Sequence, residues 1–426
     1  MENTTKSRWA GIDWGDRKHH VCIVDADGNR VGSFPVDHSA EGLEALLAKL
    51  RDHGPIAGVA IETSRHILIS KLLDANITVY PVNAKIASRW RECFAVDPAK
   101  DDGSDAFNLA YNIRCLHGRF RPLRPDDAAT RELATLCRDQ ADVVAERTRI
   151  ANKLKACLKT YYPQALEWFT DWTTPTAADF VLAFPTPQTL AQAPDNKLIT
   201  FLRCHHIGLT QTWKSHLAAR HNATPWPTDP PIEAAKSVQA LCLAKQLRTL
   251  NAGLKTYEKH IQTLFAQHPD AHIFSSLPGA GPKLAPRLLT HVGSDRERYP
   301  SAKPLQALSG TVPVKTRSGK TDIDRFRWAC RKDFRNTMFF FALQTIERSV
   351  WARAYYDQLR AKGRTHPQAL RALGAKWLKI IHRMWHDRKP YDERLYLAAL
   401  IRHNSPLIAH IRSSKKCEEI STHPLT

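Results

Sequence analysis

The sequence predicts a multidomain protein with an α/β domain at its N-terminus, a coiled-coil region in the middle and a mainly helical domain at its C-terminus. Three observations predict this class. Short apolar runs dominate residues 9–115, heptad spacing follows them, and the last third combines helical spacing with strong basic charge. The chain has 426 residues, of which 43% are hydrophobic, so it is long enough and apolar enough for more than one core.

The first domain, residues 1–125, contains five candidate strands. They are residues 9–13, 21–24, 31–36, 58–62 and 78–82. Residues 41–50 have helical spacing, and a second helix is expected between the last two strands. Three early strands followed by alternating helices and strands is the order of an RNase H-like domain, in which the first and fourth strands are neighbours.

The middle region, residues 126–268, carries two heptad patterns. The first follows Leu133, Cys137, Gln140, Val144, Arg147, Ala151, Leu154, Leu158 and Tyr161. The second follows Ala240, Leu243, Leu247, Leu250, Leu254, Tyr257, Ile261 and Leu264, with the alternating spacing of three and four that is typical of a coiled-coil seam. Residues 162–232 are rich in Trp and Pro and cannot form one continuous helix. The two helices are expected to pair with each other or with a second subunit, and the sequence leaves both open.

The charge of the chain points to a polyanionic partner. Lys and Arg number 62 against 42 Asp and Glu, a net charge of +20, and residues 271–413 hold 27 of the basic residues against 10 acidic ones. No apolar run approaches ~18 residues, so we predict no membrane span. We expect a C-terminal domain at 269–412 and a disordered tail at 413–426. With no signal peptide and no CxxC pair among the nine cysteines, we predict a reducing, cytoplasmic location, at the nucleoid during action.

Four carboxylates are candidate metal ligands. Asp13 and Glu62 each end a predicted strand, and Asp102 and Asp105 share the N-terminal face of a predicted helix. Each has an ordinary explanation as a solvated strand end or a helix cap, but a cap uses one Asp and this segment also contains Asp101. Four converging carboxylates repel one another unless cations bind between them, and oxygen ligands favour Mg²⁺. The set therefore predicts one or two Mg²⁺ ions that stabilise the attacking and leaving oxygens of a phosphodiester.

The C-terminal domain offers a second set of candidate residues. Gly279 and Gly281 lie in a turn before a helix, which resembles a helix-hairpin-helix contact to a DNA backbone, although a plain connecting turn is equally compatible. Ser318 is a candidate nucleophile because basic groups around it would stabilise charge on a phosphate under attack. Ser309, also followed by glycine, is a rival, and a Ser-Gly pair in a basic loop is ordinarily a turn that contacts phosphate. We assign further nucleic-acid contacts to Lys315, Arg317, Lys320, Arg325 and Arg327.

Seven short motifs occur in order along residues 9–392. They are Gly11-Ile-Asp13, Ala60-Ile-Glu62, Asp102-Gly-Ser-Asp105-Ala, Leu277-Pro-Gly-Ala-Gly-Pro282, Ser309-Gly-Thr-Val-Pro-Val-Lys-Thr-Arg-Ser-Gly-Lys320, Arg327-Trp-Ala-Cys330 followed by Phe334-Arg335, and Tyr355-Tyr-Asp-Gln-Leu-Arg-Ala-Lys-Gly363. In this order and spacing the chain resembles the transposases of the insertion sequence one-ten family, which are bridge-RNA-guided recombinases.

The resemblance implies an N-terminal RuvC-like DEDD domain, a coiled-coil linker and a C-terminal transposase domain. Asp13, Glu62, Asp102 and Asp105 would be the DEDD carboxylates, and Ser318 would be the nucleophile. The implied partners are donor and target DNA, a structured guide RNA, and further copies of the chain in a dimer or tetramer, with a composite site between subunits.

Three classes of function fit the residues. A serine-dependent recombinase would conserve the energy of the broken phosphodiester in a covalent intermediate, and the chain has no P-loop for ATP. A two-metal nuclease resembling a junction resolvase would use water instead. A nucleic-acid-binding scaffold would use its carboxylates only for capping and solvation. The surroundings of Ser318 separate the first two classes, and the four ordered carboxylates argue against the third.

Overall fold

The computed structural model describes residues 7–63, 67–94, 101–208, 210–222, 229–318 and 321–413. The chain divides into two compact units, Met1–Pro125 and Asp126–Thr426.

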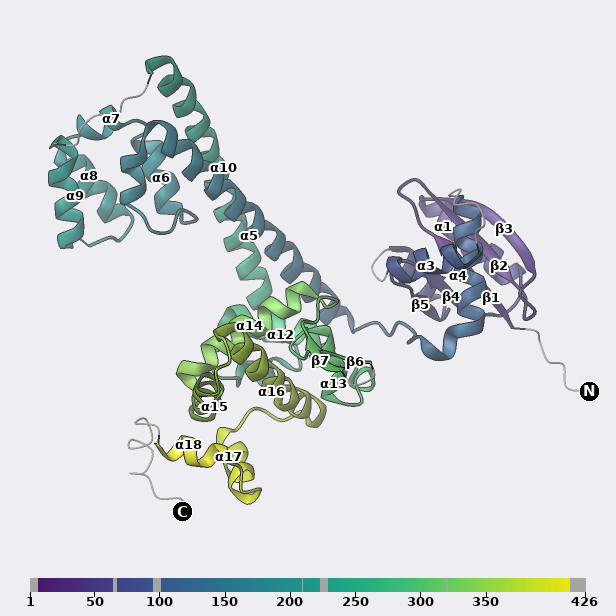
Figure 1. Cartoon of the computed structure of the whole chain (residues 1–426). Coiled ribbons are helices and arrows are strands. Elements are labelled where there is room, and N and C mark those ends of the chain that lie inside the picture. Colours follow the sequence, from purple (N-terminus) through teal and green to yellow (C-terminus); the bar gives the residue numbers. More distant parts are fainter. Residues whose placement is uncertain are drawn as a thin grey trace, which may run out of the picture. The chain divides into compact units, whose positions relative to one another are not determined.

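The first unit is built on a five-stranded mixed sheet in the order β3-β2-β1-β4-β5 (Figure 1). Its strands are β1 (Arg8–Asp13), β2 (Lys18–Val24), β3 (Arg30–Asp37), β4 (Ile56–Ile61) and β5 (Val79–Pro81). The first three strands pair antiparallel with one another, whereas β4 runs parallel to β1 and β5 parallel to β4. The predicted adjacency of the first and fourth strands is confirmed, since Ile12 lies opposite Ile61.

Helices cover both faces of this sheet because its central strands are apolar on both sides. α1 (Ala40–Asp52) and α2 (Ile67–Asp74) pack on the face that includes Ala10 and Ile12. α3 (Ala84–Phe94) and α4 (Asp102–Leu116) pack on the opposite face, with Trp9, Cys22 and Ala60. A 3₁₀ turn, η1 (His117–Arg119), follows α4.

α4 approaches β1 unusually closely at Gly11. A Cβ at this position would lie 2.1 Å from the carbonyl oxygen of Ala106 and 2.4 Å from the amide nitrogen of Ala110. Only glycine leaves room for this contact. The contact fixes the position of α4 over the strand that ends in Asp13.

The second unit contains two long helices, α5 (Ala128–Tyr161) and α10 (Pro230–Gln267), which pack side by side (Figure 1). Most residues of both heptad patterns are buried within this one chain, which is the first of the two predicted pairings. The two polar positions of the first pattern have partners: Arg287 donates to Gln140 at 3.0 Å, and Arg147 donates to Asn251 at 3.3 Å.

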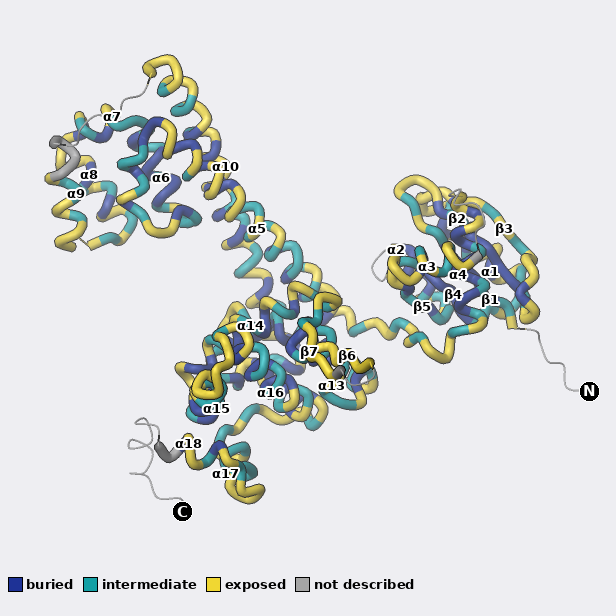
Figure 2. The backbone as a smooth tube through the Cα atoms, viewed as in Figure 1, coloured by how far each residue is buried: buried dark blue, intermediate teal, exposed yellow. Residues whose placement is uncertain are grey.

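The Trp- and Pro-rich stretch forms a small helical subdomain at one end of the α5–α10 pair (Figure 2). It contains η2 (Pro163–Glu167), α6 (Pro175–Ala183), α7 (Pro187–Ala191), α8 (Asp195–Cys204) and α9 (Gln211–Asn222). Trp168, Trp172, Phe180 and Phe184 are buried in its core. The prediction that this stretch is not one continuous helix is confirmed for the described residues.

The other end of the helix pair enters the core of a mainly helical domain, as predicted. Its helices are α11 (Ala271–Ser275), α12 (Gly281–Val292), η3 (Arg296–Arg298), α13 (Ala302–Leu308), α14 (Lys332–Arg348), α15 (Val350–Ala361), α16 (His366–Asp387), α17 (Glu393–Arg402) and α18 (Leu407–Ser413). Trp351, Trp377 and Trp385 are fully buried there. An antiparallel hairpin, β6 (Val314–Ser318) and β7 (Thr321–Arg325), interrupts the helices. The tail beyond Ser413 lies outside the described residues, and no described helix is long and apolar enough to cross a membrane.

Candidate functional site

Two of the four predicted carboxylates lie at one edge of the sheet. Asp13 is the last residue of β1, and Glu62 directly follows β4. Because β1 and β4 are parallel and adjacent, their carboxyl ends meet at the same edge. Side chains alternate along a strand, so Asp13 shares a face with Trp9 and Gly11, which is the face that α4 covers.

The first turn of α4 lies beside this edge. A Cβ at Gly103 would lie 3.3 Å from Nε2 of His20, and His20 is the cross-strand partner of Asp13. Asp102 and Asp105 belong to the same turn. The N-cap is Asp101, whose carboxylate accepts from the Ser104 amide at 3.0 Å. This hydrogen bond, together with one from the Ser104 hydroxyl, holds the pKa of Asp101 below its usual value. The capping role predicted as the ordinary alternative therefore belongs to Asp101.

Asp105 is 5% exposed and forms an ion pair with Arg91 of α3, with 2.5 Å between Nε and Oδ1. A carboxylate this buried needs a cationic partner or several hydrogen bonds to stay charged. Arg91 supplies that charge here. Asp102, by contrast, is exposed.

The donor set fits a hard divalent cation in chemistry, since all four side chains offer carboxylate oxygens. The backbone brings Asp13, Glu62 and the first turn of α4 to one end of the central strands. In the described ranges, no three His, Cys, Asp or Glu side chains are gathered closely enough to hold a metal ion. The Mg²⁺ site stays a prediction.

The two rival serines differ sharply in accessibility. Ser309 is fully buried at the end of α13, where its hydroxyl contacts the Gln306 carbonyl at 3.1 Å and the Thr311 hydroxyl at 3.0 Å. Ser318 is exposed at the end of β6, opposite Thr321. Only Ser318 is presented to a large substrate.

Arg317 faces away from Ser318. Successive side chains of a strand point to opposite faces, so Lys315 and Arg317 share one face of the hairpin and Ser318 lies on the other. On their own face these cations lie opposite acidic residues: Lys315 opposite Asp324, and Arg317 opposite Asp322, to which it donates at 3.2 Å. Both cations remain exposed, but neither shares a face with the candidate nucleophile.

The other predicted contacts of the hairpin have different surroundings. Arg327 donates to the carbonyl oxygens of Val312 and Pro313, so it ties the base of the hairpin together. Arg325 is exposed and shares the face of Ser318. Lys320 lies outside the described residues.

The predicted backbone-contact turn contains two glycines with positive φ, +76° at Gly279 and +55° at Gly281. A Cβ at Gly279 would lie 2.9 Å from Cβ of Gln344, so this turn packs against α14. No atom lies within 4 Å of the corresponding position at Gly281, where the turn enters α12. A contact to a nucleic-acid backbone here stays a prediction.

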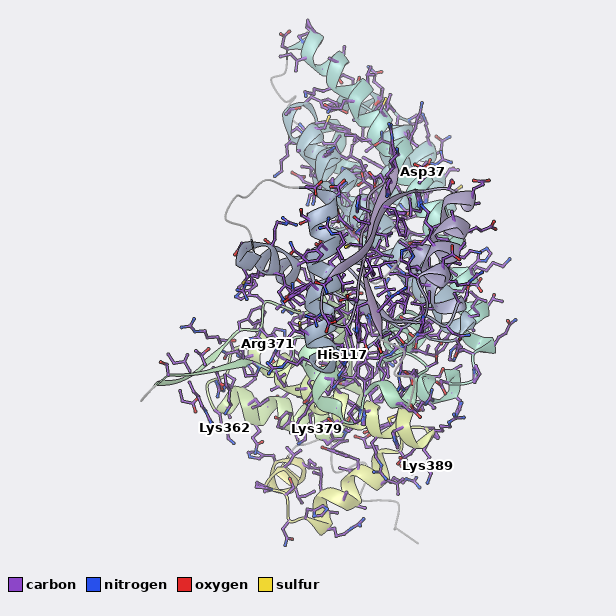
Figure 3. The ribbon with its side chains drawn as sticks, turned by 90° about the vertical axis from the view of Figure 1, so that its right-hand side faces the viewer. Asp37, His117, Lys362, Arg371, Lys379 and Lys389 are labelled. Atoms are coloured by element: carbon purple, nitrogen blue, oxygen red, sulfur yellow. The ribbon has the colours of Figure 1, made fainter. Side chains whose placement is uncertain are left out.

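Several charged and aromatic residues of these regions could not be found from the sequence pattern. Arg91 gave no signal, because an isolated Arg on an amphipathic helix has no motif. Trp328 was noticed only as part of Arg327-Trp-Ala-Cys330, although it is 79% exposed. Basic side chains also lie on the C-terminal helices or just after their ends, among them Lys362, Arg371, Lys379 and Lys389 (Figure 3).

Comparison with known proteins places the chain among transposases. A transposase family model matches residues 10–163, and a second model, for transposases of the IS116/IS110/IS902 family, matches residues 271–357. A protein named as the mini-circle transposase for IS117 of Streptomyces coelicolor is 30% identical over 404 residues, which are 92% of this chain and 97% of the relative. The chain belongs to this transposase family. The resemblance stated from the motifs is thereby confirmed.

Other relatives agree with this assignment. The transposase is 28% identical over 400 residues to the 42 kDa protein of insertion element IS900 from Mycobacterium paratuberculosis, covering 92% of this chain and 98% of the relative. It is 26% identical over 129 residues to the pilin gene-inverting protein of Moraxella bovis, covering 30% of this chain and 40% of the relative. As a member of a transposase and recombinase family, the chain is an enzyme that acts on DNA.

Proposed function

We propose that this transposase cuts and rejoins DNA through a covalent intermediate on Ser318, in a reaction that also uses Mg²⁺ held by Asp13, Glu62, Asp102 and Asp105. The observation that carries the proposal is the accessibility of Ser318. A nucleophile must reach the phosphate, and the exposed hydroxyl at the end of β6 can do so, whereas the buried Ser309 cannot.

The proposed reaction exchanges one phosphodiester for another. Ser318 Oγ forms a bond to phosphorus, and the bond from phosphorus to one oxygen of the DNA strand breaks. The serine proton passes to solvent, and the leaving oxygen takes up a proton. Rejoining is the same exchange with a DNA hydroxyl as nucleophile. The number of phosphodiester bonds is unchanged, so no ATP is required.

The N-terminal unit contributes carboxylates in a RuvC-like arrangement. Asp13 and Glu62 from the strand ends, with Asp102 and Asp105 from α4, would be the ligands of Mg²⁺. The chemistry that Mg²⁺ supplies when bound is stabilisation of negative charge on the attacking and leaving oxygens. Arg91 forms an ion pair with the buried Asp105, and this guanidinium would have to leave the carboxylate oxygen that a cation takes.

The partners follow from family and charge. DNA is the substrate of the family, and the basic C-terminal domain suits its phosphates. The family resemblance, not the geometry, supports a structured guide RNA and a dimer or tetramer. Because the heptad residues of α5 and α10 are buried against each other, such an assembly would use other surfaces.

The test is to trap and map the protein–DNA adduct. The full chain is incubated with its element DNA and Mg²⁺, denatured and digested, and the peptide linked to DNA is identified by mass spectrometry. Ser318→Ala should abolish both the adduct and strand cleavage. Thr316→Ala is the matched control, because it removes a hydroxyl from the same face of the same strand and should leave both unchanged. EDTA or Asp105→Asn should also abolish cleavage.

A nick at normal rate by Ser318→Ala would contradict the proposal. Water would then be the nucleophile, and a two-metal nuclease resembling a junction resolvase would be the better description. Full activity in EDTA would instead contradict the metal assignment alone.

A further inference from the structure

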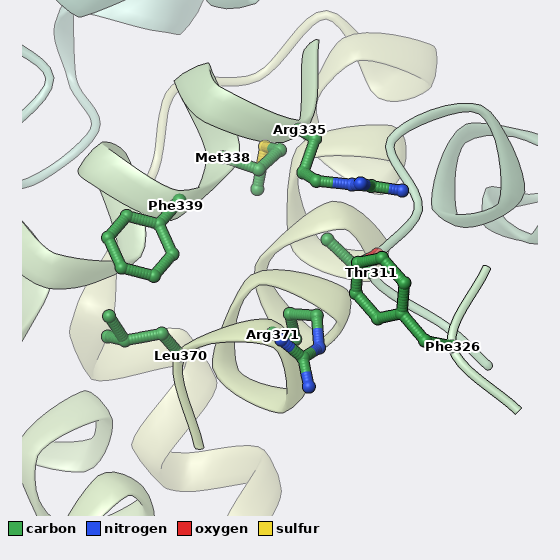
Figure 4. A pocket seen from close by; sticks show the side chains of 7 residues that line it. All are labelled: Thr311, Phe326, Arg335, Met338, Phe339, Leu370 and Arg371. Carbon is green, nitrogen blue, oxygen red and sulfur yellow. The ribbon is translucent and has the colours of Figure 1, made fainter. Parts of the chain in front are cut away.

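The residue that follows the hairpin, Phe326, is held between two arginines. The guanidinium of Arg335, from α14, lies 4.5 Å from the centre of its ring, and that of Arg371, from α16, lies 5.0 Å from it (Figure 4). Both arginines line a small cavity of about 50 Å³, together with Thr311 and four apolar side chains, one of which is Phe326. The end of the hairpin, α14 and α16 thus place two basic side chains around the Phe326 ring.

This cavity holds two positive charges without a carboxylate. Among the described residues, neither Arg335 nor Arg371 forms a salt bridge. Arg335 donates to the carbonyl of Arg327, but its Nε is buried and finds no hydrogen-bond partner in the part of the chain that the structure describes. Burial, together with the neighbouring Arg335, lowers the pKa of Arg371. Two like charges in one partly buried place repel each other, and an anion bound between them would remove that repulsion.

Trp328 lies beside the cavity and is 79% exposed. The rings of Trp328 and Phe326 are close to perpendicular, with 4.8 Å between their centres. A largely exposed indole therefore lies next to two arginines that form no salt bridge with any described residue. Nucleotide-binding surfaces combine these two kinds of side chain. Aromatic faces stack on bases, and arginines bind phosphate.

We propose that Trp328, Arg335 and Arg371 bind one unpaired nucleotide, with its base stacked on Trp328 and its phosphate held by the two arginines. The base must be unpaired because the indole can cover a base only where the neighbouring bases leave its face open. This inference rests on the proposed function only in taking nucleic acid as the ligand.

The position of this surface relative to Ser318 follows from the hairpin. Ser318 pairs with Thr321, and Arg325, which precedes Phe326, lies four strand residues further along. At about 3.4 Å per residue this is ~14 Å. A strand held at Trp328 therefore continues within a few nucleotides of the candidate nucleophile.

The experiment measures binding of the full chain to fluorescently labelled oligonucleotides of one sequence, as single-stranded DNA, double-stranded DNA and single-stranded RNA, in EDTA so that cleavage does not contribute. Trp328→Ala should weaken binding to a single strand between about 5-fold and about 100-fold, while binding to the duplex changes less than about 2-fold. Trp328→Phe should restore most of the loss. Phe340→Ala is the matched control, since Phe340 is a 55% exposed aromatic residue of α14.

The arginine is tested in the same way. Arg371→Ala should weaken single-strand binding more than Arg383→Ala, which removes an equal charge from the same helix, where the side chain is 81% exposed. A larger loss with DNA or with RNA identifies the strand that is held. The inference is overturned if Trp328→Ala behaves like Phe340→Ala, or if single strands and duplex lose equal affinity. Neither result bears on adduct formation by Ser318, so this inference and the proposed function fail separately.

Discussion

Gly11 shows how one residue fixes the candidate metal site. The α4 backbone lies against it, so the helix begins beside the end of β1, and Asp102 and Asp105 begin that helix. The carboxylates depend on this contact for their position, although Gly11 itself bears no side chain.

Gly11→Ala should therefore destabilise the first unit and disturb the site together. The new Cβ would lie 2.1 Å from the Ala106 carbonyl oxygen, so α4 must move away from the sheet. We expect a loss of about 1–3 kcal/mol, the usual range for an overpacked core. Hydrogen exchange of the α4 amides in the full chain, followed by mass spectrometry, measures the effect.

Gly118→Ala is the control for this prediction, since no atom lies within 4 Å of the corresponding Cβ position. It should leave the exchange of α4 unchanged. If the α4 amides exchange equally slowly in both variants, the close approach at Gly11 is not what holds the helix in place.

The same residues explain what the sequence could and could not predict. Asp13 and Glu62 were predictable because a strand end is visible as a change from apolar to acidic residues, and strand order then brings the two together. The partner of Asp105 was not, because Arg91 meets it only through the packing of α3 against α4. The cluster around Phe326 was missed for the same reason, since its arginines come from two later helices.

At the scale of elements, His268 joins the start of α5 to the end of α10. It is the C-cap of α10, and its Nε2 lies 2.8 Å from the hydroxyl of Thr130 in α5. Its Nδ1 accepts from the Asp270 amide at 3.0 Å, so Nε2 carries the proton of a neutral ring. Burial lowers the pKa of His268 and outweighs the opposite effect of Asp127 and Asp270.

The contribution of His268 to stability should therefore depend on pH. A pKa below the ordinary value of 6.5 means that folding favours the neutral ring. The contribution is fully present above about pH 6.5 and is lost as the pH falls below it towards the pKa of the folded state. The Tm of the wild type should fall more between about pH 7.5 and about pH 5.5 than the Tm of His268→Gln. Parallel curves for the two proteins would contradict this role.

At the scale of the whole molecule, the basic charge is concentrated in one region. Residues 271–413 contain 27 Lys and Arg against 10 Asp and Glu, and many of these cations are exposed. The prediction of a mainly helical, basic domain is confirmed. Helical spacing and net charge could both be read from the sequence because each is summed over many residues. The intrachain pairing of α5 and α10 could not be chosen beforehand, because one heptad pattern serves either kind of partner.

This concentration of charge predicts that DNA affinity falls steeply with salt. Each phosphate that the protein neutralises releases a counterion, which gives a slope of about −0.9 per contact in a plot of log affinity against log salt. Anisotropy titrations with duplex DNA between ~50 and ~200 mM salt should show a loss of more than about tenfold. Affinity that stays constant over this range would rule out a contact dominated by phosphates.

The path of the chain through the helix pair has a consequence for the order of folding. The chain leaves α5 at Tyr161 and re-enters the pair at Pro230, and Cys157 of the outgoing helix contacts the carbonyl of Lys236 in the returning one. Closing a flexible loop of roughly 70 residues costs on the order of 4 kcal/mol in chain entropy. The core of the intervening subdomain also contains residues of both helices, so forming that core and pairing this end of α5 and α10 are one event. We therefore expect the pair to form first at this end and to extend from there towards the C-terminal domain.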